Sequence, residues 1–247
     1  MARLCTALAF LIASALPLSA AETAKPLAQG LPHPAGVISG PDGRVYVTVA
    51  GTGAGGGAVL AIADGAAVPF ASGLNDPKGI VAWKDGLFVA DRNRVVRIDK
   101  AGKVTPYAEA AAFPEPPQKL SAITADERGG LYVTDLGSPK GGWALYQINP
   151  AGGGKPKPEA KLIADGERFP DLKKPTGIAM DGGGNPKAGS FHVLLLDTAG
   201  ELHSLRLADK TLTRVADVRF ERRKILRTQY TCSDTRHRSG VVVEPGV

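Results

Sequence analysis

The chain has 247 residues and carries 30 Lys and Arg against 24 Asp and Glu. Its 31 glycines and 19 prolines favour one all-β, turn-rich domain over a helical one. The net charge of +6 is concentrated near the end, because residues 218–247 hold seven Lys and Arg against three Asp and Glu. The near-neutral remainder gives no support for nucleic-acid binding.

The first twenty residues predict a secretory signal peptide. Arg3 precedes the apolar run Ala7–Leu16, and Pro17–Ala20 supplies small residues suited to cleavage. The run is too short for a membrane anchor, so we expect no membrane insertion after cleavage and a periplasmic or extracellular location. Cys5 would leave with the signal, and Cys232 would then have no partner for an internal disulfide.

The segment Pro77–Tyr107 contains four short apolar runs separated by breakers of hairpin length. The runs are Gly79–Trp83, Leu87–Asp91, Val95–Ile98 and Val104–Tyr107. Four short strands joined by tight turns predict one antiparallel sheet in up-down order. Such a sheet cannot bury its faces alone, so the unit must recur for the chain to form a core.

The unit does recur, because the sequence LFVAD at 87–91 has three near-copies. They are VYVTV at 45–49, LYVTD at 131–135 and VLLLD at 193–197. A period of about 40 residues with four strands per unit is typical of propeller blades. We therefore predict an all-β fold, an incomplete β-propeller over residues 31–217. Its four four-stranded blades cover 31–74, 75–113, 114–169 and 170–217.

Short motifs at the strand ends have structural explanations. Three units open on Pro-x-Gly, at 34–36, 77–79 and 175–177. Proline suits the start of a strand, and glycine allows close backbone approach where inner strands meet. Asp91 and Asp135 end their second strands, where a carboxylate caps the amides of the following turn. His192 and His203 are interpreted as ordinary strand residues.

A pocket is expected on one face of the propeller. In an up-down blade the inner strand begins on the face where the second strand ends, so residues at these positions recur around the axis. We predict that Lys78, Ser121 and Thr176 bind a ligand there beside Asp197. Lys140 and Trp143 are predicted to reach in from a longer loop.

These segments resemble the senescence-marker-protein/gluconolactonase family, most of all its secreted bacterial branch, and more distantly NHL-repeat propellers. The resemblance covers residues 31–217 and is carried by PKGIVAWKDGLFVADRNRVVRID, LSAITADERGGLYVTD, KPTGIAMD and VLLLDTAGELHSLRLADKTLTRVAD. It implies a six-bladed propeller that hydrolyses sugar lactones with calcium or zinc in the central pocket. The bound partner would be a small sugar or lactone.

The family's metal ligands, carried over by position, fall on five residues of this chain: Ala35, Ser121, Ala122, Thr176 and Asp197. Only Asp197 is retained, as metal ligand and as candidate catalytic residue. One carboxylate and two hydroxyls bind calcium or zinc poorly, so we predict weak or no divalent-metal binding at these positions. That prediction puts hydrolytic activity in question and makes a bound cofactor unexpected.

Three interpretations stay open. The first is an exported gluconolactonase-like propeller that binds a small polar ligand. The second is a non-catalytic scaffold that binds protein or glycan through its loops, and the third is a truncated product with little function. Residues 218–247 break the blade pattern and form an atypical basic tail. We expect this tail either to be disordered or to add one irregular strand through Gly240–Glu244.

Overall fold

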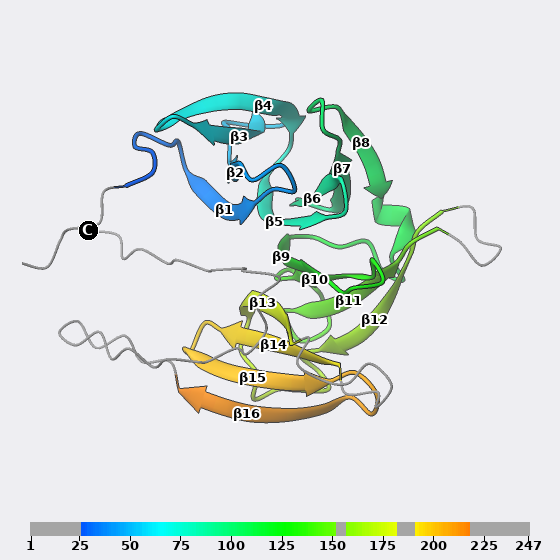
Figure 1. The fold of residues 1–247 in the computed structure, drawn as a ribbon. Helices are drawn as coiled ribbons and strands as arrows, with labels where there is room; N and C mark the ends of the chain where they lie inside the picture. Colours follow the sequence, from blue (N-terminus) through cyan, green and yellow to red (C-terminus); the bar gives the residue numbers. More distant parts are fainter. Residues whose placement is uncertain (1–25, 152–156, 182–190, 218–247) are drawn as a thin grey trace, which may run out of the picture.

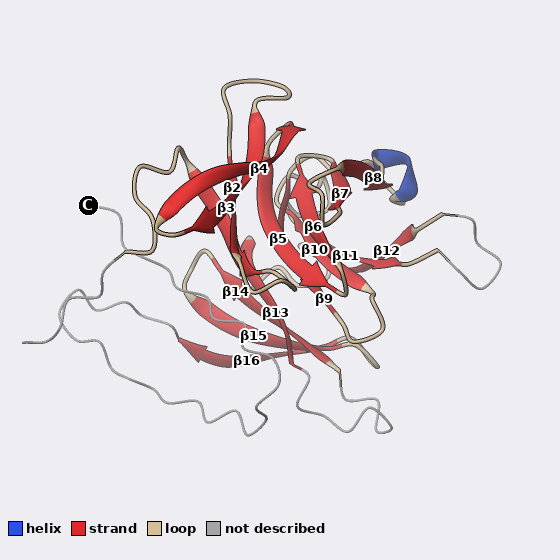
Figure 2. Cartoon of the chain, turned by 45° about the horizontal axis from the view of Figure 1, so that its top comes forward, coloured by secondary structure: helices blue, strands red, loops and turns tan. Residues whose placement is uncertain are grey.

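A computed structural model describes residues 26–151, 157–181 and 191–217 of the chain. The predicted signal peptide and the basic tail lie outside these residues. The described regular structure is almost entirely β, and Figure 2 shows one short helix after β8, the 3₁₀ turn η1 (Ala110–Ala112). In the described ranges, no helix has the length and apolar character needed to cross a bilayer.

The strands form four sheets, each made of four antiparallel strands that follow one another in the chain. Blade one holds β1 (Pro34–Ser39), β2 (Val45–Val49), β3 (Gly57–Ala63) and β4 (Ala66–Leu74). Blade two holds β5 (Pro77–Trp83), β6 (Gly86–Asp91), β7 (Arg94–Ile98) and β8 (Val104–Ala108). Blade three holds β9 (Leu120–Ala125), β10 (Leu131–Asp135), β11 (Ala144–Asn149) and β12 (Glu159–Asp165). Blade four holds β13 (Pro175–Asp181), β14 (His192–Asp197), β15 (Glu201–Arg206) and β16 (Thr211–Asp217).

The four sheets stand in an open arc, with blades one and four at its ends (Figure 1). Their first strands β1, β5, β9 and β13 line the inner side, where each contacts the first strand of the next blade. This arrangement is that of propeller blades around an axis. The prediction of an incomplete all-β propeller with four blades is therefore confirmed for the described part of the chain.

The hydrophobic core lies between blades, and one strand can contribute side chains to two core clusters. On β6, Leu87 and Val89 pack toward blade one, whereas Phe88 and Ala90 pack toward blade three. Successive side chains of a strand point to opposite faces, so a strand covered on both sides must be apolar throughout. Blade two therefore needs both neighbouring blades to bury its apolar side chains.

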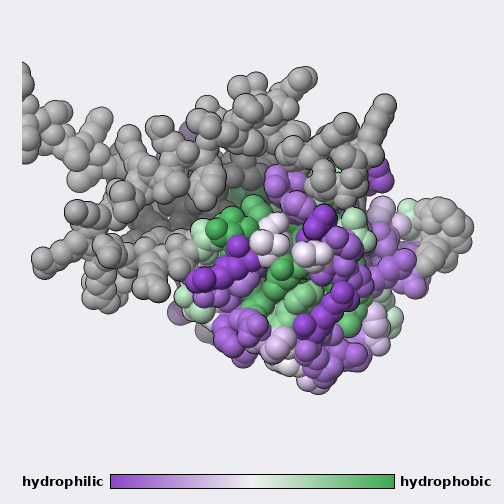
Figure 3. Space-filling model, turned by 90° about the horizontal axis from the view of Figure 1, so that it is seen from below, coloured by the Kyte–Doolittle hydropathy of each residue, from purple (hydrophilic) through white to green (hydrophobic). Residues whose placement is uncertain are grey.

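The outer face of blade four marks one end of the arc. On β14, Val193 and Leu195 are buried against blade three, while the alternating Leu194 and Leu196 are only half-buried. On β16, Val215 is 50% exposed. Figure 3 views the molecule from this end and shows apolar side chains gathered between polar ones.

The glycines of the first two Pro-x-Gly motifs allow inner strands to touch. A Cβ atom on Gly36 would lie 2.5 Å from the carbonyl oxygen of Lys78. A Cβ atom on Gly79 would lie 2.5 Å from the carbonyl oxygen of Ser121. Real Cβ atoms do not approach backbone so closely, so only glycine fits at both positions. The predicted role is confirmed for Gly36 and Gly79 but not for Gly177, where the nearest atoms to an added Cβ belong to Leu196 of the same blade.

A buried threonine joins blades one and two at the same level. The hydroxyl of Thr48 accepts a hydrogen bond from the amide of Gly36 at 2.8 Å. It also donates to the carbonyl oxygen of Lys78 at 2.6 Å, and the side chain is fully buried. Two neighbouring inner strands thus share one hydroxyl group.

Replacing Thr48 by valine keeps the side-chain shape but removes both hydrogen bonds. We expect the free energy of unfolding to fall by about 1–3 kcal/mol, because two backbone groups lose their partner. Chemical denaturation measures this loss. Thr105→Val is the control, since its hydroxyl donates one bond, to Arg97 at 3.2 Å, in a half-buried position. An equal loss in the two variants would contradict the bridging role of Thr48.

Candidate functional site

The start of each inner strand and the end of its second strand lie at the same end of the blade. Pro77 pairs with Asp91, and Pro175 pairs with Asp197. We call this end of the four blades the loop face. The structure places Ala35, Lys78, Ser121 and Thr176 at equivalent positions on it, each the second residue of its inner strand.

The side chains at these positions differ in exposure and charge. The ammonium group of Lys78 pairs with Asp76 at 2.9 Å, and the Lys78 side chain is 31% exposed. Ser121 is half-buried and Thr176 is exposed. These four positions therefore offer one cation and two hydroxyl groups, and nothing polar from Ala35.

The two residues predicted to reach in from the blade-three loop have other partners. Lys140 pairs with Glu115 at 3.3 Å, and its hydrogen bond to that carboxylate raises the pKa of Lys140. Trp143 is only 2% exposed, and its indole N–H donates to the carbonyl oxygen of Leu172 at 3.0 Å. The indole packs in the core between blades three and four. Ligand binding by Lys140 and Trp143 stays a prediction.

The described surface includes a depression on each face. One, of about 400 Å³, opens on the loop face between blades three and four beside Lys173, Lys174 and Thr198. The other, of about 270 Å³, lies on the opposite face between blades one and two. There Tyr46 donates to Asp42 at 2.7 Å, and burial, then this hydrogen bond, raises the pKa of Tyr46 to about 12. That phenol therefore stays neutral near neutral pH.

The aspartates that end the second strands hold backbone in place. Asp91 accepts hydrogen bonds from the amides of Asn75 and Asp76 at 2.7 and 2.9 Å, and from Arg94 at 3.1 Å. Asp135 likewise accepts from three backbone amides: those of Gln118, Lys119 and Gly137. Each carboxylate ties its turn to the segment before the inner strand. The predicted capping of the following turn is confirmed for Asp135, through the amide of Gly137, whereas Asp91 accepts amides from the segment before β5.

Asp197 occupies the same position in blade four. One of its oxygens accepts from the amides of Ala199 and Glu201, both at 2.9 Å, and the other from Lys173 at 3.1 Å. Its side chain is fully buried. Asp197 therefore contacts both its following turn and the segment before the inner strand, as Asp135 does, in addition to any role at a site.

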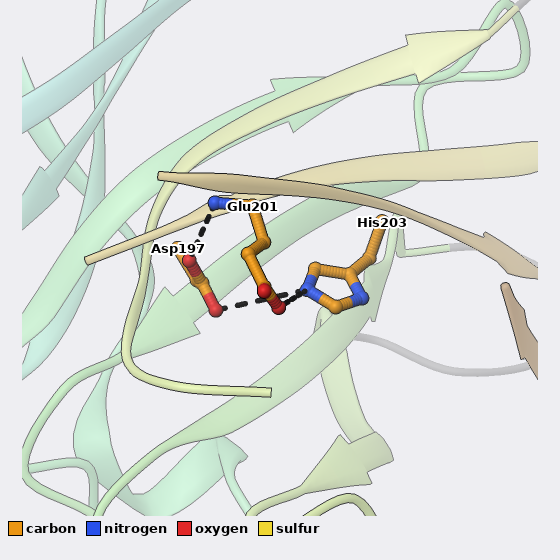
Figure 4. Close-up of side chains that lie close together, drawn as sticks. All are labelled: Asp197, Glu201 and His203. Carbon is orange, nitrogen blue, oxygen red and sulfur yellow. Dashed lines mark hydrogen bonds and ion pairs between the residues drawn. The ribbon is translucent and has the colours of Figure 1, made fainter. Parts of the chain in front are cut away.

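A second carboxylate and an imidazole lie next to Asp197 (Figure 4). His203 Nε2 is 3.6 Å from Oδ2 of Asp197 and 3.5 Å from Oε2 of Glu201. We call Asp197, Glu201 and His203 the blade-four cluster. Sequence reasoning singled out only Asp197. The signal for the other two was Glu-x-His in a strand, which puts both side chains on one face.

The donors at the inherited metal positions do not fit calcium or zinc. Ala35 and Ala122 carry no side-chain ligand atom, and the Thr176 hydroxyl is exposed. Asp197 is the single carboxylate at these positions. Calcium takes six to eight oxygens and zinc usually takes three protein ligands, so this set supports neither ion. No chemical step at the loop face is assigned to a metal.

Comparison with known proteins finds similar folds among solved structures. No family model matches the chain, and no curated protein matches it. A solved structure of a candidate gluconolactonase is similar, with 16% identity, a TM-score of 0.57, and 78% of this chain and 66% of that chain covered. A gluconolactonase from Xanthomonas campestris also has 16% identity, with a TM-score of 0.52 over 76% of this chain and 63% of that one.

A protein of unknown function from Bacteroides thetaiotaomicron is similar at 17% identity and a TM-score of 0.51, over 74% of this chain and 46% of that one. The chain thus spans no more than about two thirds of these proteins' own lengths. At such identities the likeness concerns the fold. The chain is a β-propeller whose structural neighbours include gluconolactonase-like proteins.

Proposed function

We propose that this chain is an exported gluconolactonase-like propeller of the secreted bacterial branch and that its loop face binds a small polar ligand, a sugar or a sugar lactone. The observation that carries the proposal is the recurrence of Lys78, Ser121 and Thr176 at equivalent starts of neighbouring inner strands. An ammonium group donates hydrogen bonds, and hydroxyls both donate and accept. Polyhydroxylated ligands need such mixed partners in a fixed arrangement.

We propose that the loop face binds the ligand, and the assay below measures whether the bound lactone is hydrolysed. The metal that supplies water activation in lactonases of this kind has no adequate donor set at the inherited positions. The basic and hydroxyl groups on the loop face can still orient a carbonyl or a carboxylate. We therefore expect an affinity for aldonolactones, for the corresponding acids, or for both, whether or not turnover follows.

Isothermal titration with a panel of aldonolactones and aldonic acids tests this proposal, with a parallel hydrolysis assay in the presence and absence of calcium and zinc. Lys78→Met is expected to weaken binding about tenfold or more, since one charge-assisted hydrogen bond contributes about 1.5–3 kcal/mol. Lys84→Met is the matched control, because Lys84 follows the other end of β5 and lies over the Trp83 ring. Equal weakening by both variants, or no binding to any panel member, would refute the proposal.

Export is the second part of the proposal and rests on the composition of residues 1–20. Expression in a Gram-negative host should deliver the chain to the periplasm, with cleavage near Ala20 or Ala21. Mass spectrometry of the periplasmic fraction measures the new N-terminus. An intact N-terminus in the cytoplasmic fraction would contradict export.

A further inference from the structure

The hairpin of β14 and β15 brings three metal-ligating side chains together at the loop face (Figure 4). We propose that the blade-four cluster binds one divalent transition-metal ion, zinc being the best match, through Nε2 of His203, Oδ2 of Asp197 and Oε2 of Glu201. The site shares Asp197 with the inherited positions. Its donors all come from one hairpin, and the other two, Glu201 and His203, lie at positions the family resemblance does not assign.

The spacing of the donor atoms suits a small ion. Each of the three residues offers one ligand atom, and these atoms lie within 4.8 Å of one another. The two measured separations from His203 Nε2 are 3.5 and 3.6 Å. Tetrahedral zinc with bonds of about 2.0–2.1 Å places neighbouring ligand atoms roughly 3.3–3.4 Å apart. The two separations from His203 Nε2 are within a few tenths of an ångström of this value.

His203 supplies an independent reason to expect a ligand. Its side chain is 6% exposed, and Nε2 is buried without a hydrogen-bond partner among the described residues. A buried polar atom without a partner costs free energy, so native structures rarely leave one. Nε2 faces both carboxylates, as the dashed lines in Figure 4 mark. A bound cation would use this lone pair together with the two carboxylate oxygens.

The blade register shows that the acidic pair is particular to blade four. In blade two, Asp91 pairs in register with Arg94, whose guanidinium contacts the carboxylate at 3.1 Å. In blade four the corresponding position beside Asp197 is Glu201, a second carboxylate. Arg214 contacts Oε1 of Glu201 at 2.9 Å, which leaves Oε2 directed at His203. Two adjacent carboxylates, one fully buried, favour a bound cation between them.

The position of His203 requires no polar side chain for folding. Pairing with the second strand puts His203 opposite Leu195. The residues at the same register position in the other blades are Leu60, Val96 and Tyr146. Two of these are aliphatic, so packing between blades does not require an imidazole at this position. This comparison also predicts that His203→Leu folds.

The donor types indicate the class of ion. One imidazole and two carboxylates match zinc and similar transition metals, with a fourth position for water or a ligand. Calcium prefers six to eight oxygens and would use the imidazole poorly. Both Thr198, next to Asp197, and Lys173, whose amide contacts Asp197, line the loop-face depression. The ion would therefore fix the turn at the rim of that depression.

Isothermal titration of the full chain with zinc chloride and with calcium chloride tests the proposal. We expect one zinc equivalent per chain and much weaker calcium binding. We expect His203→Leu and Glu201→Gln each to weaken zinc binding tenfold or more. At a zinc concentration about 100 times Kd, the melting temperature of the wild-type chain should rise by about 5–10 °C, and this rise should vanish in both variants.

Three control variants separate this site from other zinc ligands in the chain. His192→Leu replaces a half-buried histidine at the far end of β14, and Cys232→Ser removes a thiol. Thr176→Val removes an inherited donor. All three should bind zinc like the wild type.

Unchanged binding in folded His203→Leu or Glu201→Gln, or loss of binding in Thr176→Val, would overturn the assignment. So would an absence of zinc binding by the wild type. If one cluster variant fails to fold, the other decides. Sugar binding is tested separately through Lys78, so the two proposals can fail independently.

Discussion

Asp91→Ala is expected to lower the free energy of unfolding by about 3–5 kcal/mol. The side chain is fully buried, accepts two backbone amides and pairs with Arg94. Alanine would leave the amides of Asn75 and Asp76 without an acceptor and a half-buried guanidinium without its anion, and losses of this kind are large. Denaturant unfolding followed by circular dichroism measures the effect.

The control for this substitution is an aspartate in the same blade. Asp85 is 61% exposed and pairs with Arg97 at 3.2 Å. Exposed ion pairs contribute little to stability, so Asp85→Ala should shift the unfolding midpoint far less than Asp91→Ala. Similar shifts in the two variants would show that the buried aspartate does not hold the turn to the inner strand.

Gly79→Ala is expected to destabilise the propeller by about 3 kcal/mol, at the upper end of overpacking effects. The new Cβ atom would lie 2.5 Å from the carbonyl oxygen of Ser121 and 2.8 Å from the amide nitrogen of Ile123. Both atoms belong to the β9 backbone, so relief requires blades two and three to separate. Thermal unfolding of the purified variant measures the loss.

Gly86→Ala is the matched substitution at the other end of the hairpin. There the nearest atom to a new Cβ is Nε of Arg97 at 3.0 Å, on a flexible side chain that can move. We expect a clearly smaller loss than for Gly79→Ala. If both substitutions cost the same, close contact between inner strands is not the reason for glycine in the Pro-x-Gly motif.

The architecture could be predicted because it is repeated in the sequence. The copies of LFVAD locate β2, β6, β10 and β14, and the glycines of the first two Pro-x-Gly motifs locate the inner-strand contacts. The contact between Asp135 and the amide of Gly137 followed from a carboxylate at a strand end before a turn. These contacts follow from local patterns, whereas the amides that Asp91 accepts lie 15 and 16 residues before it and could not be predicted in this way.

The blade-four cluster could not be predicted in the same way. His203 lies six positions after Asp197, and the two side chains meet only because Leu196 pairs with Leu202 across a tight turn. That register depends on the turn geometry, which the sequence leaves open. Trp143 was expected at the pocket because it lies in the longer loop of blade three. Its indole is buried between blades three and four and donates to Leu172, and the residue also lines the loop-face depression, so ligand binding by Trp143 stays a prediction.

The most direct test of the proposed ligand site is a residue-level map of sugar-lactone binding. Backbone amide chemical shifts of the labelled chain would be followed during titration with the tightest member of the aldonolactone and aldonic-acid panel. We expect the largest changes at Lys78, Ser121 and Thr176, at the starts of β5, β9 and β13, and little change at Asp85 and Asp126 in the opposite turns. Changes confined to those opposite turns, or none at saturating ligand, would contradict a binding site on the loop face.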